Sequence, residues 1–582
     1  MARRTVADQL VEILLAAGVR TMYGVVGDAL NPVTDSIRRH PGIDWIHVRH
    51  EETGAFAAGA EAQLTGRLGC CAGSSGPGHV HLVNGLYDAH RSHAPVVAIA
   101  AHVPSTELGT GYFQETNPTL LFADCSHYCG IVTRREQMAR VAQMAVQMSL
   151  GRGGVSVVTL PGDVAGEPAS SAYLEHTYRL GQRPTADPTE SVIAEFAQLV
   201  NEARTVTLFC GRGVAGAHDQ VIALAEKLKA PVGHAMRGKD WIEYDNPYDV
   251  GMSGLLGYGA CYDAMQECEL LILLGTDFPY VQFMPKDSKV VQVDIARERL
   301  GRRSRLDLGV WGDAGDTVRA LLPKVAEKTD RSFLDRMLRR HRELMGRVHA
   351  YAQGADGRRP IHPEQVASAI NEIAADDAVF TVDTGMCNVW AARFIHATGK
   401  RRFLGSFNHG TMANALPQSI GAQHVDRNRQ VVAICGDGGF TMLMGDFLTL
   451  LQYDLPVKVV IFDNSSLAMV ELEMLVAGLP PYQTRMKEPD FAAVARAAGA
   501  TGIRIEDPAD VRDGLREAFA TPGPVLVDAV TDPNALSMPP KITPEQVKGF
   551  GLAFSKIVLS GDFDAAREMA RANIRNLPLP RP

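Results

Sequence analysis

Two apolar, β-branched runs that each end in small polar residues place the strongest constraint on how this chain can fold. The run at 431–439 reads VVAICGDGG, and the run at 457–466 reads VKVVIFDNSS. Two such runs about 20 residues apart indicate a βαβ unit with parallel strands. Because parallel strands end at the same edge of a sheet, we expect Asp437 and Asn464 to lie side by side where open α/β folds bind ligands.

The residues at this edge have the chemistry of a magnesium–diphosphate site. Mg²⁺ prefers hard oxygen ligands and usually shares its shell with phosphates, and glycines beside a carboxylate let backbone N–H groups approach those phosphates. A Gly-Asp-Gly sequence alone is more often a tight turn. An asparagine 27 positions after the aspartate, following a second strand, makes metal binding by Asp437 and Asn464 the better interpretation.

A second candidate lies far away, at the start of a predicted helix. The segment 48–60 reads VRHEETGAFAAGA, so small apolar residues follow Glu51 and packing can bury it. A glutamate in an apolar setting can share a proton with a heteroaromatic base, since burial favours its neutral form. The alternative is that Glu51 or Glu52 is only a first-turn residue favoured by the helix dipole.

Length and composition are those of an ordinary globular chain with about three or four domains. A net charge of −8 and the lack of a basic stripe with interleaved aromatic residues argue against a nucleic-acid partner. Nine cysteines without a C-x-x-C pair favour a reduced compartment. The N-terminus leads into an amphipathic helix and not a signal core, and no run approaches the roughly 18 apolar residues of a membrane span.

Helical and apolar stretches alternate along the chain, which predicts parallel sheets. The fold class expected is α/β, with three doubly wound parallel-sheet domains at 1–180, 190–345 and 360–535 and a C-terminal helical tail at 536–582. Gly, Pro, Ser and Thr are frequent near 165–190, and a linker precedes 360. The expected strands are 96–101, 155–160, 206–210, 270–275, 290–295, 378–383, 431–435, 457–462 and 525–530.

The middle region carries two candidate ligand segments. Residues 211–216 have the GxGxxG pattern after a strand, but no clear acidic residue follows about 20 positions on, so the dinucleotide signal is weak. Residues 274–280 follow a buried strand, and Asp294 ends the next one, where its carboxylate could hold a ribose. A purely structural α/β domain is the alternative.

Taken together, these motifs resemble those of the flavin-dependent pyruvate oxidases, most closely the branch that transfers electrons to a membrane quinone. The resemblance covers essentially the full chain and is carried by 111–116 (GYFQET), 237–239 (RGK), 244–252 (YDNPYDVGM) and 405–415 (GSFNHGTMANA). It implies the thiamine-diphosphate-enzyme architecture, with thiamine diphosphate, Mg²⁺ and FAD as cofactors. It also implies a homotetramer in which Glu51 of one subunit and Asp437 of another form one active site.

The resemblance implies a role for each matched residue. Glu51 would hydrogen-bond the cofactor pyrimidine, the Gly410 carbonyl would receive its amino group, and Met412 would separate the two cofactor rings. The Ser466 backbone would complete the Mg²⁺ shell of Asp437 and Asn464. Catalytic or substrate-facing residues would be Glu51, Phe113, Gln114 and Glu473. Residues implied for thiamine diphosphate are Glu51, Gly410, Thr411, Met412, Asp437, Gly438, Gly439, Asn464, Ser465, Ser466, Leu467, Ala468, Met469 and Val470. Residues implied for FAD are Ser253, Gly254, Leu255, Leu256, Thr276, Asp277, Phe278, Pro279, Tyr280 and Asp294.

One loop departs from the family pattern. Met469 stands where the family has a phenylalanine near the route from thiamine to flavin, and Ala468 and Glu471 differ as well. Asp463 stands where the family often has a second asparagine, while the ligand position Asn464 is retained.

The function implied is oxidative decarboxylation of pyruvate to acetate and CO₂, with electrons transferred through FAD to a quinone. The alternatives are a carboligase such as an acetolactate synthase, a phosphate- and oxygen-dependent pyruvate oxidase, and a catalytically silent subunit on the same fold. Four histidines are candidate proton carriers but are equally well structural, so none is assigned a catalytic role: His90, His93, His127 and His409.

The C-terminal tail is predicted to form a helix from Asp562 to Leu577 with Arg567, Arg571 and Arg575 on one face. A basic amphipathic helix can lie on an anionic bilayer, or it can dock on its own protein. The resemblance implies a cytoplasmic protein that associates peripherally with the inner face of the cell membrane.

Overall fold

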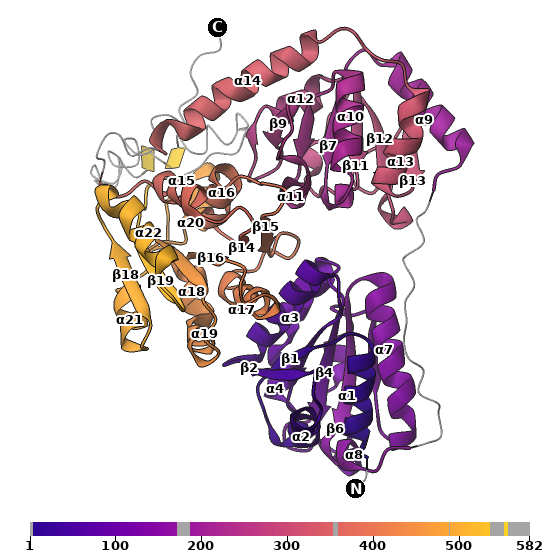
Figure 1. Ribbon diagram of the computed structural model, residues 1–582, viewed down its shortest axis with the longest axis vertical. Coiled ribbons are helices and arrows are strands. Elements are labelled where there is room, and N and C mark those ends of the chain that lie inside the picture. Colours follow the sequence, from indigo (N-terminus) through magenta and orange to yellow (C-terminus); the bar gives the residue numbers. More distant parts are fainter. Residues whose placement is uncertain are drawn as a thin grey trace.

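The computed structural model describes residues 4–170, 187–352, 359–487, 489–535, 552–553 and 555–556. The chain forms three α/β domains, each built on one sheet (Figure 1). Every strand pair in these sheets is parallel except β9 with β10, and most strands are buried along their full length. Helices on both faces are what a buried parallel sheet requires. The expected fold class is confirmed.

The N-terminal sheet has the strand order β2-β1-β3-β4-β6-β5. Its strands are β1 Thr21–Gly24, β2 Asp44–His47, β3 Gly69–Gly73, β4 Val96–His102, β5 Tyr128–Ile131 and β6 Val155–Pro161. Its helices are α1 Val6–Ala16, α2 Asn31–Arg39, α3 Glu51–Thr65, α4 Pro77–His81, α5 Val83–Arg91, α6 Pro118–Leu121, α7 Met138–Arg152 and α8 Gly162–Gly166.

The middle sheet has the order β10-β9-β8-β7-β11-β12-β13. Its strands are β7 Val206–Cys210, β8 Val232–His234, β9 Asp249–Met252, β10 Tyr258–Gly259, β11 Leu270–Leu274, β12 Lys289–Asp294 and β13 Leu308–Trp311. Its helices are α9 Glu190–Glu202, α10 His218–Leu228, α11 Lys239–Ile242, α12 Cys261–Glu267, α13 Ala314–Leu321 and α14 Ser332–Val348. The GxGxxG segment forms one 3₁₀ turn at Arg212–Val214 and does not open a helix.

The C-terminal sheet has the order β15-β14-β16-β17-β19-β18. Its strands are β14 Val379–Val382, β15 Arg402–Gly405, β16 Val431–Gly436, β17 Lys458–Asp463, β18 Thr501–Ile505 and β19 Val525–Val530. Its helices are α15 Pro363–Ile373, α16 Met386–Phe394, α17 Ala415–Val425, α18 Asp437–Leu443, α19 Phe447–Gln452, α20 Ala468–Val476, α21 Phe491–Ala497 and α22 Val511–Ala520. All nine strands expected from the sequence are present within one or two residues of the expected limits.

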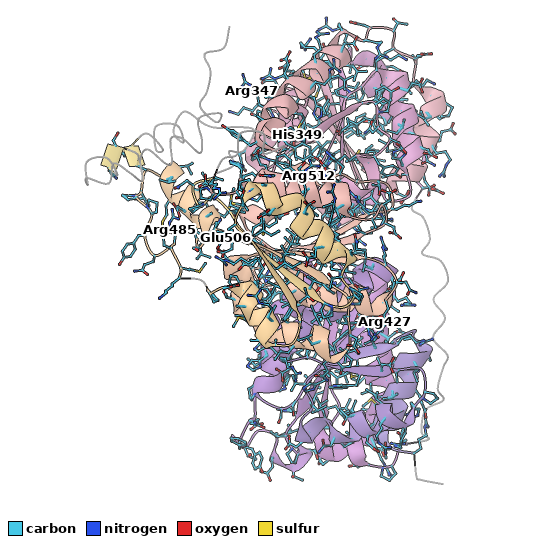
Figure 2. The ribbon with its side chains drawn as sticks, turned by 60° about the vertical axis from the view of Figure 1, so that its left-hand side comes forward. Arg347, His349, Arg427, Arg485, Glu506 and Arg512 are labelled. Carbon is cyan, nitrogen blue, oxygen red and sulfur yellow. The ribbon has the colours of Figure 1, made fainter. Side chains whose placement is uncertain are left out.

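The N-terminal and C-terminal domains pack on each other through α3 and α17. A Cβ on Gly421 of α17 would lie 2.1 Å from the Ala57 carbonyl oxygen of α3, so only glycine permits this approach. The Asp446 carboxylate accepts hydrogen bonds from the Arg49 N–H and the Thr53 hydroxyl, both at 2.7 Å. Nearby, the Arg427 guanidinium donates to the Tyr453 carbonyl at 3.0 Å (Figure 2).

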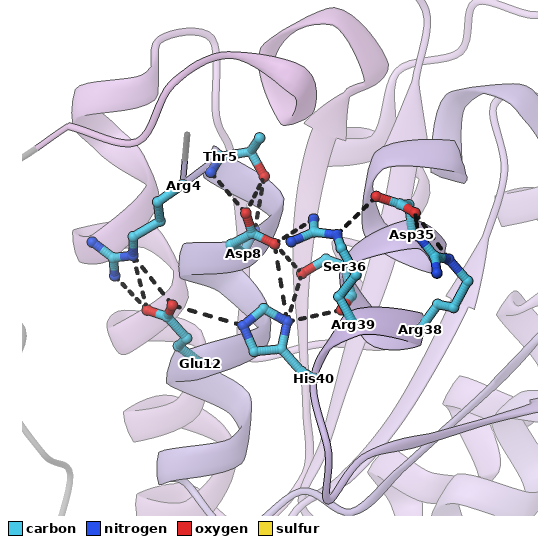
Figure 3. A network of polar contacts seen from close by, with 9 residues as sticks. All are labelled: Arg4, Thr5, Asp8, Glu12, Asp35, Ser36, Arg38, Arg39 and His40. Atoms are coloured by element: carbon cyan, nitrogen blue, oxygen red, sulfur yellow. Dashed lines mark hydrogen bonds and ion pairs between the residues drawn. The ribbon is translucent and has the colours of Figure 1, made fainter. Parts of the chain in front are cut away.

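Helix α1 starts with a complete capping box. The Asp8 N–H donates to the Thr5 hydroxyl, and the Thr5 N–H donates to the Asp8 carboxylate at 2.8 Å. The same carboxylate accepts from Ser36 and Arg39 of α2, both at 2.7 Å (Figure 3). Burial raises the pKa of Asp8, but these hydrogen bonds outweigh it and lower the pKa to about 2.

The tail helix predicted from Asp562 to Leu577 lies outside the described residues. Among the described residues, no helix has the length and apolar character needed to cross a membrane.

Candidate active site

Asp437 and Asn464 lie together at the carboxyl edge of the C-terminal sheet, as the sequence predicts. Gly436 of β16 is in register with Phe462 of β17, so the two chains leave the sheet side by side. The Asn464 N–H donates to Asp437 Oδ2 at 2.9 Å, and the Gly438 N–H donates to Oδ1 at 2.7 Å. The Asn464 side-chain oxygen accepts from the Ser466 N–H at 2.9 Å, which fixes the loop that follows.

The electrostatics of this edge suit a bound cation. Burial raises the pKa of Asp437, although N–H groups from Gly438 and from residues 464–466 oppose the shift. Burial and the neighbouring Asp437 charge also raise the pKa of Asp463. A divalent cation beside Asp437 would favour its charged form and offset the cost of burying it. Carboxylate, amide and backbone oxygens at 437 and 464–466 are the donor set that Mg²⁺ prefers.

The glycines after Asp437 form a cradle that has no room for side chains. A Cβ on Gly438 would lie 2.7 Å from Leu467 Cδ2 and 3.1 Å from Met486 Cε. A Cβ on Gly439 would overlap the carboxylate of Asp383, which is itself buried at the end of β14. A phosphate can approach backbone N–H groups only where side chains are absent, so this edge fits a diphosphate with its metal.

The loop that carries Met412 lies beside this cradle. Met412 Cε would be 3.3 Å from a Cβ on Gly438, and Gly410 has a φ of +79°, which favours glycine. The Thr411 N–H donates to the Ser406 hydroxyl at 3.1 Å. The Thr411 hydroxyl accepts from the Asn84 side chain of the N-terminal domain at 3.0 Å. The predicted positions at 410–412 and 437–439 are therefore brought together.

Glu51 is the first residue of α3 and is 8% exposed. His81, at the end of α4, places its Nδ1 atom 2.9 Å from Glu51 Oε2. The His81 ring stacks on His50, the N-cap of α3, with 4.3 Å between ring centroids. The sequence reasoning missed His81 because no spacing rule connects residues 30 positions apart in different helices.

The proposed substrate residues are not enclosed by the described chain. Phe113 is 79% exposed, and the Gln114 side chain accepts from the Ser75 hydroxyl at 3.0 Å. Glu473 lies exposed on α20. Phe113 and Gln114 belong to the N-terminal domain and Glu473 to the C-terminal domain, and no hydrogen bond or ring contact that the structure describes joins them.

The carboxyl edge of the middle sheet gathers the segments assigned to FAD. Ser253 follows β9, Thr276 follows β11, and Asp294 ends β12. The buried Ser253 hydroxyl has no hydrogen-bond partner among the described residues. A Cβ on Gly254 would be 3.2 Å from the rings of Phe278 and Tyr280, so these segments pack closely. An unpartnered buried hydroxyl in a loop cluster fits a bound polar group.

Three arginines near the same edge, of which Arg237 and Arg299 are half-buried and Arg212 is exposed, favour an anion there. Arg237 follows β8, and its guanidinium donates to the Ser92 carbonyl of the N-terminal domain at 3.0 Å. Burial, followed by the like charge of Arg212, lowers the pKa of Arg237 to about 9, and Arg299 adds to the repulsion. A diphosphate would relieve this repulsion, so the donor set fits the phosphates of a dinucleotide.

The segment assigned to FAD and the segment assigned to thiamine diphosphate pack against one hydrophobic cluster. Leu256 of the middle domain and Met469 of α20 are both partly buried against this cluster, which includes Met252 of the middle domain and Phe462 of the C-terminal domain. Met469 contributes a flexible thioether side chain to this packing.

The four histidines considered as proton carriers each take part in a hydrogen bond, and burial lowers the pKa of every one of them. Burial lowers the pKa of His90 and His93 to about 4 and also lowers the pKa of His127 and His409. His409 Nε2 lies 2.9 Å from the Asn84 side-chain oxygen, and His93 Nε2 lies 2.8 Å from the Arg299 guanidinium. These contacts agree with the structural interpretation.

Comparison with known proteins identifies the family. Residues 4–121 match the N-terminal TPP binding domain of thiamine pyrophosphate enzymes, 193–321 the central domain, and 383–529 the C-terminal TPP binding domain. The chain belongs to the thiamine pyrophosphate enzyme family.

Three relatives illustrate its range. YdaP of Bacillus subtilis (strain 168), designated a thiamine pyrophosphate-containing protein, is 34% identical over 97% of both chains. The pyruvate oxidase of Lactiplantibacillus plantarum is 29% identical over 90% of this chain and 87% of its own. The acetolactate synthase large subunit of Parasynechococcus marenigrum is 31% identical over 90% of this chain and 86% of its own.

Proposed function

We propose that this protein is a thiamine-diphosphate- and FAD-dependent pyruvate:quinone oxidoreductase. Pyruvate and water are converted to acetate and CO₂, and the two electrons and two protons released reduce a quinone to its quinol. The observation that carries the proposal is that Leu256, in the segment assigned to FAD, and Met469, in the segment assigned to thiamine diphosphate, pack against the same hydrophobic cluster. This shared cluster supports electron transfer between the two segments.

The chain's own residues would bind and orient the reactants. Asp437, Asn464 and the Ser466 backbone would hold Mg²⁺, and the N–H groups of 438–439 would hold the diphosphate. Glu51 would hold a proton at the cofactor pyrimidine, with His81 fixing its carboxylate. Thiamine diphosphate, when bound, supplies the electron sink that decarboxylation needs.

Assembly into a homotetramer completes the site in this proposal. Several large apolar side chains of the N-terminal and C-terminal domains are exposed in the single chain, and a second subunit would cover them in this assembly. They are Phe113 at 79%, Leu120 at 74%, Tyr482 at 73% and Met442 at 60%. A second subunit would bring Glu51 of one chain to Asp437 of the other and enclose Phe113, Gln114 and Glu473.

The proposed electron acceptor places the protein at the cytoplasmic face of the cell membrane. Quinones are held in the bilayer. The arginines at 567, 571 and 575, on the helix predicted for the tail, would bind an anionic lipid surface. The association would be peripheral and reversible.

Two related activities are the competing candidates, each supported by a relative. The acetolactate synthase relative favours carboligation of two 2-keto acids, and the pyruvate oxidase relative favours oxidation by another acceptor. A carboligase need not reduce its flavin. An oxidase that makes acetyl phosphate depends on phosphate and forms peroxide.

The deciding experiment mixes the purified holoenzyme with pyruvate under anaerobic conditions and follows flavin absorbance. Bleaching that recovers on addition of a soluble quinone, with acetate as product, supports the proposal. The Glu51→Gln variant should stay yellow. CO₂ release with a flavin that remains oxidised would instead indicate a carboligase, and peroxide with acetyl phosphate would indicate the oxygen-dependent oxidase.

A further inference from the structure

A buried carboxylate on α20 joins two segments that cross directly after the proposed metal ligands. The segments are the loop at 464–467 and the segment 482–486. Glu471 is 2% exposed. Its Oε2 accepts from the Ser466 hydroxyl at 2.7 Å and from the Thr484 hydroxyl at 3.4 Å. Its Oε1 accepts from the Arg485 guanidinium at 3.1 Å. The Glu471 side chain thus binds residues of both crossing segments. We call Glu471, Ser466, Thr484 and Arg485 the clasp.

The crossing is also paired through the backbone. The Leu467 N–H donates to the Thr484 carbonyl at 2.9 Å, and the Met486 N–H donates to the Ser465 carbonyl at 2.9 Å. Ser466 and Arg485 form an isolated antiparallel bridge. Because Ser465 directly follows Asn464, the segment 482–486 lies across the loop that carries the proposed Mg²⁺ ligands.

The crossing forms one wall of the glycine cradle. Leu467 and Met486 lie on the two crossing segments, one on each. Their side chains come nearest to Gly438, with Met412 beside them. Within the single chain the outer side of the same segment is open, since Tyr482 is 73% exposed and the Arg485 side chain 50% (Figure 2). The buried contacts to Glu471 therefore secure an otherwise exposed segment.

We propose that Glu471 is a positioning residue whose carboxylate holds 482–486 onto the metal-binding loop and so determines how tightly the Mg²⁺–diphosphate end of the cofactor is retained. The inference rests on the proposed function only in taking Asp437 and Asn464 as that site. Replacing the carboxylate by an amide removes the ionic partner of Arg485 and gives the Ser466 and Thr484 hydroxyls a weaker acceptor. The loop then samples positions in which its ligands are misplaced.

The test compares Glu471→Gln with Glu372→Gln in the cofactor-free full chain. Glu372 accepts from Arg512 at 3.0 Å, an exposed pair between α15 and α22, so its loss removes a similar ion pair away from the clasp (Figure 2). Binding of thiamine diphosphate with Mg²⁺ is followed by intrinsic fluorescence. We expect the dissociation constant of Glu471→Gln to rise at least tenfold, equal to about 1.4 kcal/mol, and that of Glu372→Gln to stay within twofold.

The rate of trypsin cleavage at 485–487 provides a second measurement. A general loss of stability would not change this rate in a way that bound cofactor reverses. Cleavage after Arg485 or Lys487 should be faster in cofactor-free Glu471→Gln than in the wild type, and saturating cofactor should restore protection. The Ser466→Ala variant, which removes one hydrogen-bond donor to Glu471, should show the same changes at smaller size. It keeps the inference testable if Glu471→Gln fails to fold.

An unchanged dissociation constant, or a loss of affinity matched by a general loss of thermal stability without faster cleavage at 485–487, would overturn the inference. Failure of the wild type to bind thiamine diphosphate with Mg²⁺ would overturn it together with the proposed site. Binding requires no turnover, so failure of pyruvate to reduce the flavin would count against the proposed reaction alone.

Discussion

His81 Nδ1 lies 2.9 Å from Glu51 Oε2, and this contact connects a half-exposed histidine to a nearly buried carboxylate. The bond holds one carboxylate oxygen and leaves the other, Oε1, near Gly78. Hydrogen bonds to charged groups contribute about 1.5–3 kcal/mol. We therefore expect His81→Leu to slow the deuterium exchange of the bound thiazolium proton about tenfold while cofactor affinity stays within threefold. An unchanged exchange rate would show that Glu51 needs no such support.

The Asp437 carboxylate is expected to determine metal affinity. Asp437→Asn removes the charge that a buried cation needs, so half-saturation by Mg²⁺ should rise at least 100-fold in a titration of thiamine diphosphate binding. The control is Asp454→Asn, an exposed residue with a φ of +48°, a conformation that asparagine adopts readily. Equal Mg²⁺ dependence in the two variants would rule out Asp437 as a ligand.

Arg237 is expected to retain the flavin. Arg237→Met removes one of three arginines whose mutual repulsion a diphosphate would relieve, so the ratio of flavin to protein after gel filtration should fall at least fivefold. Arg204→Met, which breaks an exposed ion pair with Glu269, should keep the wild-type ratio. A full flavin complement in Arg237→Met would mean that the arginines bind another anion.

The parts of the fold that the sequence predicts are those buried on both faces. Strands β16 and β17 are continuous apolar runs because helices cover both sides, and their common edge follows from parallel pairing. Edge strands such as β2 and β18 are partly exposed, carry mixed residues and were not expected. An edge strand has a neighbour on one side only, so its sequence carries a weaker pattern.

The same distinction holds within the site. Asp437 and Asn464 come together because two adjacent strands end there, which sequence spacing reveals. The contacts of Glu51 with His81 and of Glu471 with Arg485 depend on loop paths and side-chain rotamers that no periodicity encodes. Loop segments position residues through individual hydrogen bonds, so only the structure shows their partners.

The approach of α3 to α17 should make Gly421 indispensable for joining the N-terminal and C-terminal domains. Alanine there would place its Cβ 2.1 Å from the Ala57 carbonyl oxygen, and the forced shift should cost about 1–3 kcal/mol of unfolding free energy. Gly445→Ala, where a Cβ would meet nothing within 4 Å, should change stability little. Urea unfolding of both variants measures the difference, and equal midpoints would contradict the close packing.

Asp8 should stabilise the N-terminal domain in a pH-dependent way. Its folded-state pKa of about 2 lies below the ordinary value of 3.8, so the charged form is favoured by folding. A depressed carboxyl pKa contributes stability that is fully present above about pH 4 and is lost as the pH falls toward 2. The contribution amounts to about 1–2 kcal/mol. Asp8→Asn removes the charge and leaves one amide oxygen in place of the two carboxylate oxygens that accept from Thr5, Ser36 and Arg39.

Urea unfolding of wild type and Asp8→Asn, followed from pH 7 to pH 2.5, tests this relationship. The difference in unfolding free energy should be constant above about pH 4 and shrink below it, because the wild-type carboxyl group then becomes neutral in the unfolded chain and finally in the folded one. The exposed Asp219→Asn variant, whose side chain is 98% exposed, should match the wild type throughout. A difference that stays constant down to pH 2.5 would mean that the capping geometry stabilises α1 and the charge contributes nothing.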